Sequence, residues 1–118
     1  MVAQNSLLKA PPFPVAQAVQ ALGANLRTAR LRRNLSLQDM AEKIGVERHA
    51  VAAAEKGKPS TSIAIYAALL WALGLEGQLQ DVAGPDRDQE GKTLAQRRER
   101  ARAAPARGAA GQGLSDDF

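Results

Sequence analysis

The sequence predicts an all-α protein: a five-helix bundle that lies between an extended N-terminal arm and a mobile C-terminal tail. Aromatic residues make up only 3% of the 118 residues, and runs of β-branched residues are few. This composition favours helices that pack through small aliphatic side chains. Apolar residues recur at the spacing of a single helix face, and prolines and glycines divide this pattern into short segments.

Residues 1–13 are predicted to form the arm, because three prolines near its end oppose a helix. The first helix is expected from about Pro14 to Arg33, with the proline in its first turn. Gly23 weakens the middle of this helix, and Asn34 tolerates the left-handed conformation that ends it. The shared apolar face consists of Val15, Val19, Leu22 and Leu26.

Two short helices follow. Ser36 is the predicted N-cap of the second helix, and Asp39 stands three residues later, in a partial capping box. Gly45 ends this helix, and the third helix is expected from Val46 or Glu47 to the Lys56-Gly57 pair. The inward faces are Leu37, Met40, Ala41 and Ile44 on the second helix and Ala50, Val51 and Ala54 on the third.

The connection between these two helices has the features of a DNA-binding helix-turn-helix. Ala41 is small enough to let the helices cross closely, and Gly45 permits the positive φ that the turn needs. Val51 would fill the crossing from the third helix. Ala54 is smaller than the Ile or Leu expected there, so Leu69 or Leu70 would fill the core instead. The full set is Met40, Ala41, Ile44, Gly45, Val46 and Val51.

The fourth helix, Ile63 to Leu73, is apolar nearly all round and is capped by Ser60 or Ser62. One stripe (Tyr66, Leu69, Leu70 and Leu73) suffices for the core. The other (Ile63, Ala67 and Trp71) is expected to meet the arm or a second subunit. A homodimer is predicted, because a two-fold dimer reads two half-sites about 34–36 Å apart. A short fifth helix with Leu75, Leu79 and Val82 on one side closes a domain over residues 14–83.

Residues 84–118 are charged and poor in large apolar side chains, so this tail is predicted to be largely disordered. Residues 92–104 would form at most a transient helix there. Four arginines have two possible interpretations, a nucleic-acid patch or a solvated charged tail. They are Arg97, Arg98, Arg100 and Arg102.

Bulk composition narrows the classes of function. The net charge of +4 suggests a polyanionic partner. The absence of cysteine excludes disulfides, thiolate metal sites and cysteine nucleophiles, and it fits a reducing cytoplasm. His49 is the sole histidine, without a clustered carboxylate pair or a phosphate-cradling loop, so no catalysis, metal or cofactor is expected. We expect no signal peptide, because the first residues lack a basic leader and a sustained apolar run, and we expect the stretch from Ile63 to Leu75 to be too short to cross a membrane.

The segments "LSLQDMAEKIGV" and "EKGKPS", with "ALGL" after them, give the region from about Leu22 to Leu79 a resemblance to the Xre/Cro repressor-type helix-turn-helix family. This resemblance implies a lambda-repressor-like five-helix domain. It also implies an ion pair between Arg30 and Glu55, more structural than functional, that joins the first and third helices. The flanks look like HipB-type antitoxin regulators, which implies autorepression at a palindromic operator and a HipA-like kinase toxin as partner.

The resemblance also implies that the start of the third helix enters the major groove. Arg48 would form a bidentate pair with guanine, worth about 1–3 kcal/mol of discrimination. His49 would donate to a base edge or a phosphate. Glu47 would accept from cytosine or favour the positive end of its own helix. The residues expected to contact bases are Glu47, Arg48, His49, Ala52 and Ala53. Those expected to contact phosphates are Lys56, Lys58, Ser36 and Ser60. Many family members carry a DNA-contacting glutamine at the position of Leu37, and Gln38 is the nearest substitute here.

Three functions remain open at this point: an antitoxin repressor, a stand-alone Xre-type regulator, and a protein-interaction adaptor with the same fold. Leu37 and the run of alanines from Ala52 to Ala54 depart from the family pattern, and these departures leave the adaptor function open. Arg48 and His49 are also compatible with solvated residues on an ordinary helix. If the two motif helices were continuous, or if these two side chains were buried, the repressor interpretation would fail.

Overall fold

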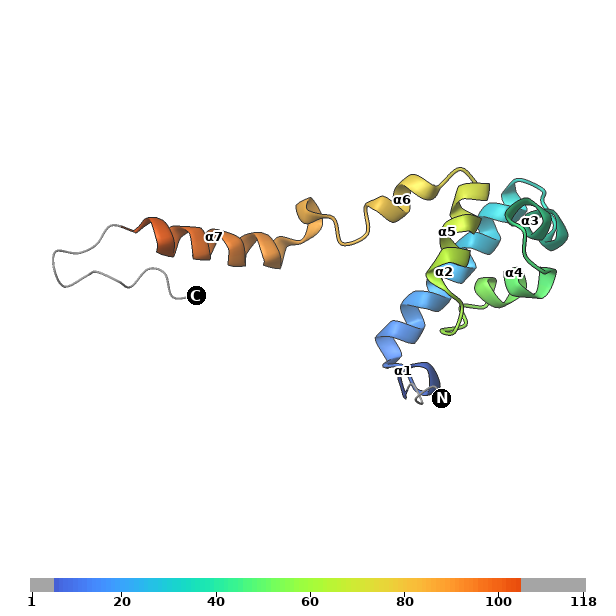
Figure 1. Ribbon diagram of the computed structural model, residues 1–118, viewed down its shortest axis with the longest axis horizontal. Helices are drawn as coiled ribbons and strands as arrows, with labels where there is room; N and C mark the ends of the chain where they lie inside the picture. Colours follow the sequence, from blue (N-terminus) through green and yellow to red (C-terminus); the bar gives the residue numbers. More distant parts are fainter. Residues whose placement is uncertain (1–5, 105–118) are drawn as a thin grey trace. The chain divides into compact units, whose positions relative to one another are not determined.

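The structure is a computed structural model, and it describes residues 6–104. Within that range every regular element is a helix and no strand is present, which confirms the predicted all-α class (Figure 1). The chain divides into two compact units, Met1–Gln80 and Asp81–Phe118. The elements are α1 (Ser6–Lys9), α2 (Phe13–Arg32), α3 (Leu37–Ile44), α4 (Arg48–Glu55), α5 (Ile63–Ala72), α6 (Glu76–Gln80), the 3-10 helix η1 (Pro85–Arg87) and α7 (Gln89–Ala103).

The N-terminal arm differs from its prediction. Ser6–Lys9 form the single turn α1, in which the Ala10 N–H donates to the Ser6 carbonyl at 2.9 Å. The prolines restrict only themselves and the residue before each of them, so they do not oppose a turn further upstream. Pro12 is extended, with φ −52° and ψ 144°, and α2 begins directly after it. Residues 1–5 of the predicted arm lie outside the described residues.

The first unit is built around α2, α3, α4 and α5, which lie together in Figure 1. Helix α4 packs against α2, α3 and α5, so three elements hold it in place. Val51 and Ala54 are fully buried on its inner side, and Leu69 of α5 is 1% exposed in the same cluster. The cluster consists of Leu26, Met40, Ala41, Val51, Ala54, Tyr66, Leu69, Leu70, Ala72 and Leu73.

Helices α2 and α4 approach unusually closely at two glycines. A Cβ placed on Gly23 would lie 2.5 Å from the carbonyl oxygen of Ala54. A Cβ on Gly57, directly after α4, would lie 2.5 Å from the Cα of Gln20. No side chain fits at either position without a backbone shift, because real Cβ atoms do not approach that closely. The glycine that weakens α2 as a helix is therefore the residue that lets α4 rest on it.

The turn between α3 and α4 is centred on Gly45, which has φ 79° and ψ 35°. The N–H groups of Gly45 and Val46 both donate to the Ala41 carbonyl, at 2.8 and 3.0 Å, and this pattern closes the end of α3. Glu47 is extended, with φ −82° and ψ 154°, and serves as the N-cap. Helix α4 therefore begins at Arg48, one or two residues later than predicted.

The end of the domain also differs from the prediction. Leu75 and Leu79 pack against the core, but α6 ends at Gln80. Val82 does not share a helix face with them; it is 69% exposed and belongs to the second unit. Gln89–Ala103, expected to be disordered or transiently helical, form α7. Its N-cap is Asp88, whose Oδ1 accepts from the Gly91 N–H at 2.9 Å. Residues 105–118 of the predicted tail lie outside the described residues.

Candidate nucleic-acid interface

The first turn of α4 presents polar side chains to solvent. Glu47, Arg48 and His49 are all exposed, so neither basic side chain is packed inward. The His49 Nδ1 lies 3.2 Å from the Glu47 Oε1, and the two side chains are 82% and 79% exposed. The Nδ1 edge of the imidazole therefore lies beside the Glu47 carboxylate, in a weak, solvent-exposed contact that leaves Nε2 available to a ligand.

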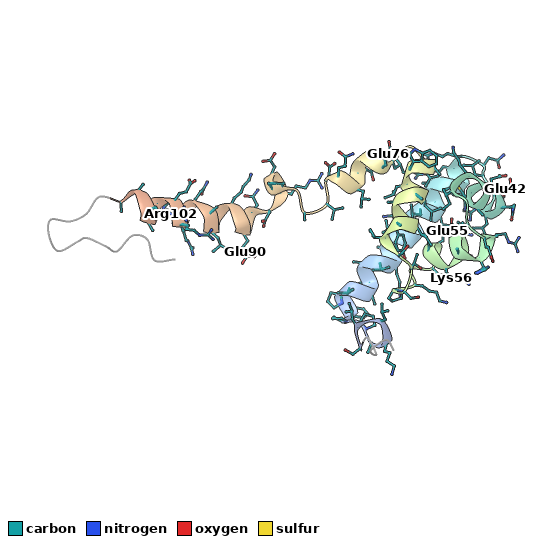
Figure 2. The ribbon with its side chains drawn as sticks, in the orientation of Figure 1. Glu42, Glu55, Lys56, Glu76, Glu90 and Arg102 are labelled. Atoms are coloured by element: carbon teal, nitrogen blue, oxygen red, sulfur yellow. The ribbon has the colours of Figure 1, made fainter. Side chains whose placement is uncertain are left out.

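The remainder of the outward face of α4 is small. Ala52 and Ala53 are half-buried and lie one turn beyond Arg48 and His49. Lys56 is exposed directly after the helix, at the position labelled in Figure 2. Polar atoms available for base contacts are therefore concentrated in the first turn, and a cation stands at the other end.

An ion pair fastens the C-terminal end of α4 to α2 (Glu55 is labelled in Figure 2). The Arg30 Nε donates to the Glu55 Oε2 at 2.7 Å, and the Arg30 Nη2 donates to the Oε1 at 2.9 Å. The side chains are 8% and 6% exposed. The hydrogen bond to Glu55 raises the pKa of Arg30 above its ordinary value. Because Nη1 also donates to the Leu35 carbonyl at 2.9 Å, the guanidinium is committed to the interior.

Ser36 and Asp39 form a complete capping box at the start of α3. The Ser36 Oγ accepts from the Asp39 N–H at 2.9 Å, and the Ser36 N–H donates to the Asp39 Oδ2 at 2.8 Å. The hydrogen bond from the Ser36 backbone N–H, and a second one from the Ser36 side chain, lower the pKa of the Asp39 carboxyl below its ordinary value. The Ser36 side chain also hydrogen-bonds the Asp39 carboxylate, so its hydroxyl would have to exchange this partner in order to donate to a phosphate oxygen.

Gln38 lies on the exposed side of α3, where its Nε2 donates to the Glu42 Oε2 at 3.0 Å. Its amide is thus paired with a carboxylate, which makes it a poorer donor to DNA than the sequence suggested. The four-residue spacing of the two residues on a helix permits this pair, although it does not by itself specify the partner. Leu37, next to it, is half-buried and packs against the core.

The loop after α4 carries the remaining predicted phosphate contacts. Lys58 and Ser60 are exposed. The Lys58 N–H donates to the Ala53 carbonyl at 3.2 Å, and the Tyr66 hydroxyl donates to the Lys58 carbonyl at 3.4 Å. Burial raises the pKa of Tyr66, so its hydroxyl stays a proton donor at neutral pH. The loop backbone is held in place while the lysine side chain is free to extend.

The predicted dimer stripe lies on α5. Ile63 is 65% exposed and Trp71 is 55% exposed, while Ala67 between them is half-buried. Ser62, rather than Ser60, caps this helix, and its Oγ accepts from the Ile65 N–H at 3.3 Å. The structure thus brings two large apolar side chains to the surface of one helix, at a spacing of eight residues.

Among residues 6–104, no three His, Asp or Glu side chains come together as a metal site. None of the helices there has both the length and the apolar character needed to span a bilayer.

Comparison with known proteins places the site within a described domain. A family described as "Helix-turn-helix domain" matches residues 21–83, which is more than half of the 118-residue chain. The matched region contains α3, the Gly45 turn and α4, together with the predicted DNA contacts. No curated protein and no solved structure matches the chain. A domain of this kind suggests DNA binding.

Proposed function

The chain belongs to the helix-turn-helix domain family, and from that premise we propose that it is a sequence-specific, DNA-binding transcriptional repressor. The observation that carries the proposal is the first turn of α4. There Arg48 and His49 are exposed, while the other side of the same helix is anchored by Val51, Ala54 and the ion pair of Glu55. A rigid helix with an exposed polar first turn is what major-groove reading requires.

In the proposed complex, Arg48 donates two hydrogen bonds to O6 and N7 of a guanine. His49 uses Nε2 toward a base edge or a phosphate, with Glu47 holding the other side of the ring. Ala52 and Ala53 meet thymine methyl groups. The phosphate contacts are Lys56, Lys58, Ser60 and the Ser36 hydroxyl. Gln38 joins them when its amide releases Glu42 and donates to the DNA instead. Such contacts set the register of the protein on the duplex rather than its base preference.

We further propose that two copies bind a palindromic operator. An eight-residue helix is only about 12 Å long, so one copy reads a short site, whereas a two-fold dimer doubles it. The proposed contact is the α5 stripe of Ile63, Ala67 and Trp71. Trp71→Gln should shift the protein toward the monomer in sedimentation equilibrium. Phe13→Gln, a matched change at an aromatic residue 73% exposed on α2, should leave the mass unchanged.

The test of DNA reading uses the DNA upstream of the gene itself. Wild-type protein should protect a defined site in a footprint and bind it more tightly than a scrambled duplex. Arg48→Gln should reduce this preference by about 5- to 150-fold, which corresponds to about 1–3 kcal/mol, and should leave salt-sensitive binding to any duplex. Arg87→Gln, the same charge change in the second unit, should keep the preference. Equal binding of wild-type protein to both duplexes would contradict the proposal.

A narrower proposal concerns the regulated operon. The flanking segments resemble HipB-type antitoxin regulators, so the operon would encode a HipA-like kinase toxin that binds this protein. The resemblance of the flanks is its sole support. A neighbouring kinase-like reading frame whose product co-elutes with the chain would support it. A neighbourhood without one would leave a stand-alone Xre-type regulator.

The adaptor alternative is favoured by one observation, the scarcity of polar readers beyond the first turn of α4. Ala52 and Ala53 are half-buried, and Gln38 is paired with Glu42. An adaptor would bind no duplex in a manner that depends on Arg48. If Arg48→Gln changes neither the affinity nor the preference for any DNA, the adaptor replaces the repressor.

A further inference from the structure

Charge is ordered along the second unit. Residues 81–90 carry four carboxylates and one arginine, whereas residues 91–104 carry five basic side chains and one glutamate. Glu90 and Arg102 mark the two ends of α7 in Figure 2. Acidic groups near the N-terminus of a helix and basic groups near its C-terminus both complement the helix dipole. This order stabilises α7 although none of its residues is buried.

The arginines at the basic end of α7 make no stabilising contact with the rest of the described chain. Arg97, Arg98, Arg100 and Arg102 are all exposed, and no hydrogen bond or ion pair joins any of them to another residue in 6–104. Glu99 is the sole carboxylate among residues 97–102, so these six positions carry a net charge of +3 from four arginines. Four guanidinium groups thus lie within about 9 Å of helix, because each residue rises about 1.5 Å.

We propose that this basic end, residues 97–102, is a second DNA contact, which binds the phosphate backbone beside the site that α4 reads. The inference rests on the proposed function and adds a partner surface to it. Guanidinium groups bind phosphate oxygens through paired hydrogen bonds, and DNA offers one charge per about 1.7 Å of its axis. The contact is independent of base sequence, so it adds affinity rather than preference.

Tethering favours DNA over other polyanions. Residues 81–88 join α7 to the unit that contains α4, so a duplex bound by α4 is also within tether length of α7. Such a linker spans at most about 28 Å at about 3.5 Å per residue, and α7 adds about 22 Å. The basic end therefore samples a high local concentration of flanking phosphate. An anionic membrane fits less well, since Leu94 is the one large apolar residue on α7 and provides no stripe to insert.

The experiment replaces all four arginines by glutamine in the full chain. Binding to the upstream DNA and to a scrambled duplex is followed by fluorescence anisotropy over a series of salt concentrations. The plot of log K against log salt has a negative slope, and its magnitude should decrease by about 2–4, since each phosphate contact contributes about 0.9. The preference for the upstream DNA should stay unchanged. A matched variant with four lysines should retain the slope, because it keeps the charge. Circular dichroism should show that α7 keeps most of its helicity in the glutamine variant, because glutamine is a good helix former, although the charges that complement the helix dipole are lost.

The outcomes separate this inference from the proposed function. An unchanged slope in the glutamine variant, with Arg48→Gln still lowering the preference, refutes the α7 contact and leaves the repressor standing. Failure of wild-type protein to bind either duplex refutes both. Binding of the wild type, but not of the glutamine variant, to an acidic protein or to anionic vesicles with no change in DNA slope also refutes the inference and assigns the arginines elsewhere.

Discussion

The ion pair between Arg30 and Glu55 should contribute strongly to stability, and Glu55→Gln tests this. Both side chains are less than 10% exposed. The substitution removes the negative charge and leaves one amide oxygen to serve two guanidinium donors, now held at 2.7 and 2.9 Å. A hydrogen bond to a charged group is worth about 1.5–3 kcal/mol, and unpairing a buried charge costs about 3–5 kcal/mol. The amide keeps one bond, so we expect a loss of about 3 kcal/mol.

The measurement is urea unfolding followed by circular dichroism, with thermal unfolding as a second readout. A unit of this size has a free energy of unfolding of about 4–12 kcal/mol, so the loss is a large share of it. The midpoint of thermal unfolding should fall by about 12–24 °C. The matched variant Arg30→Met with Glu55→Met removes both charges together. It should cost less than either single change, because no buried charge is then left unpaired.

Two results would refute the reasoning about this pair. A loss below about 1 kcal/mol for Glu55→Gln would mean that water reaches the guanidinium, as it does in exposed pairs. A double variant whose loss equals the sum of the two single losses would mean that Arg30 and Glu55 are not energetically coupled. Either result would mean that the packing of α4 on α2 depends on the close approach at Gly23 and Gly57 and not on the ion pair.

The remaining predictions concern the backbone approach and the helix caps. Gly23→Ala would place a Cβ within 2.6 Å of two backbone oxygens of α4 and should cost about 1–3 kcal/mol in calorimetry, whereas Gly77→Ala, with no atom within 4 Å, should gain up to about 1 kcal/mol. Glu47 caps α4 without a side-chain hydrogen bond, so Glu47→Ser should stabilise the protein by about 0.5–2 kcal/mol in urea unfolding; a loss of stability would contradict this. The pKa of Asp39 is lowered in the folded state by its bonds to Ser36, so its stabilisation is complete above the ordinary value of 3.8 and is lost as the pH falls through the lowered folded value. The stability difference between wild type and Asp39→Asn should therefore be constant at neutral pH and vanish in acid, and a difference that persists in acid would exclude this cause.

The boundaries of the central helices could be predicted because local residues encode them. Ser36 caps α3, and Gly45, Gly57 and Gly74 adopt φ of 79°, 73° and 77° at or just beyond the ends of α3, α4 and α5. Each signal needs one or two neighbours in sequence and no knowledge of the fold. The start of α4 was placed too early because Val46 and Glu47 are compatible with a helix but are extended in the turn.

Other features depend on contacts that the sequence does not display. Gly23 reads as a weak point in a helix until α4 lies against it. Helix α7 is another such feature, because a lack of large apolar residues predicts disorder, whereas the Asp88 cap and the order of the charges stabilise this helix although none of its residues is buried. The pairing of Gln38 with Glu42 follows a recognisable spacing, yet nothing in the spacing shows which partner a side chain chooses.

The alanines of α4 connect the fold to its proposed function. Ala54 is fully buried where α4 meets Gly23, and a larger residue there would push the two helices apart. The close approach brings Glu55 within reach of Arg30, so small size and the ion pair support the same geometry. A helix held this tightly offers polar base-reading side chains only in its first turn, and its second turn offers the methyl groups of Ala52 and Ala53. The protein would then contact few bases, and most of its affinity for DNA would come from phosphate contacts. A tethered basic helix such as α7 would supply additional contacts of that kind.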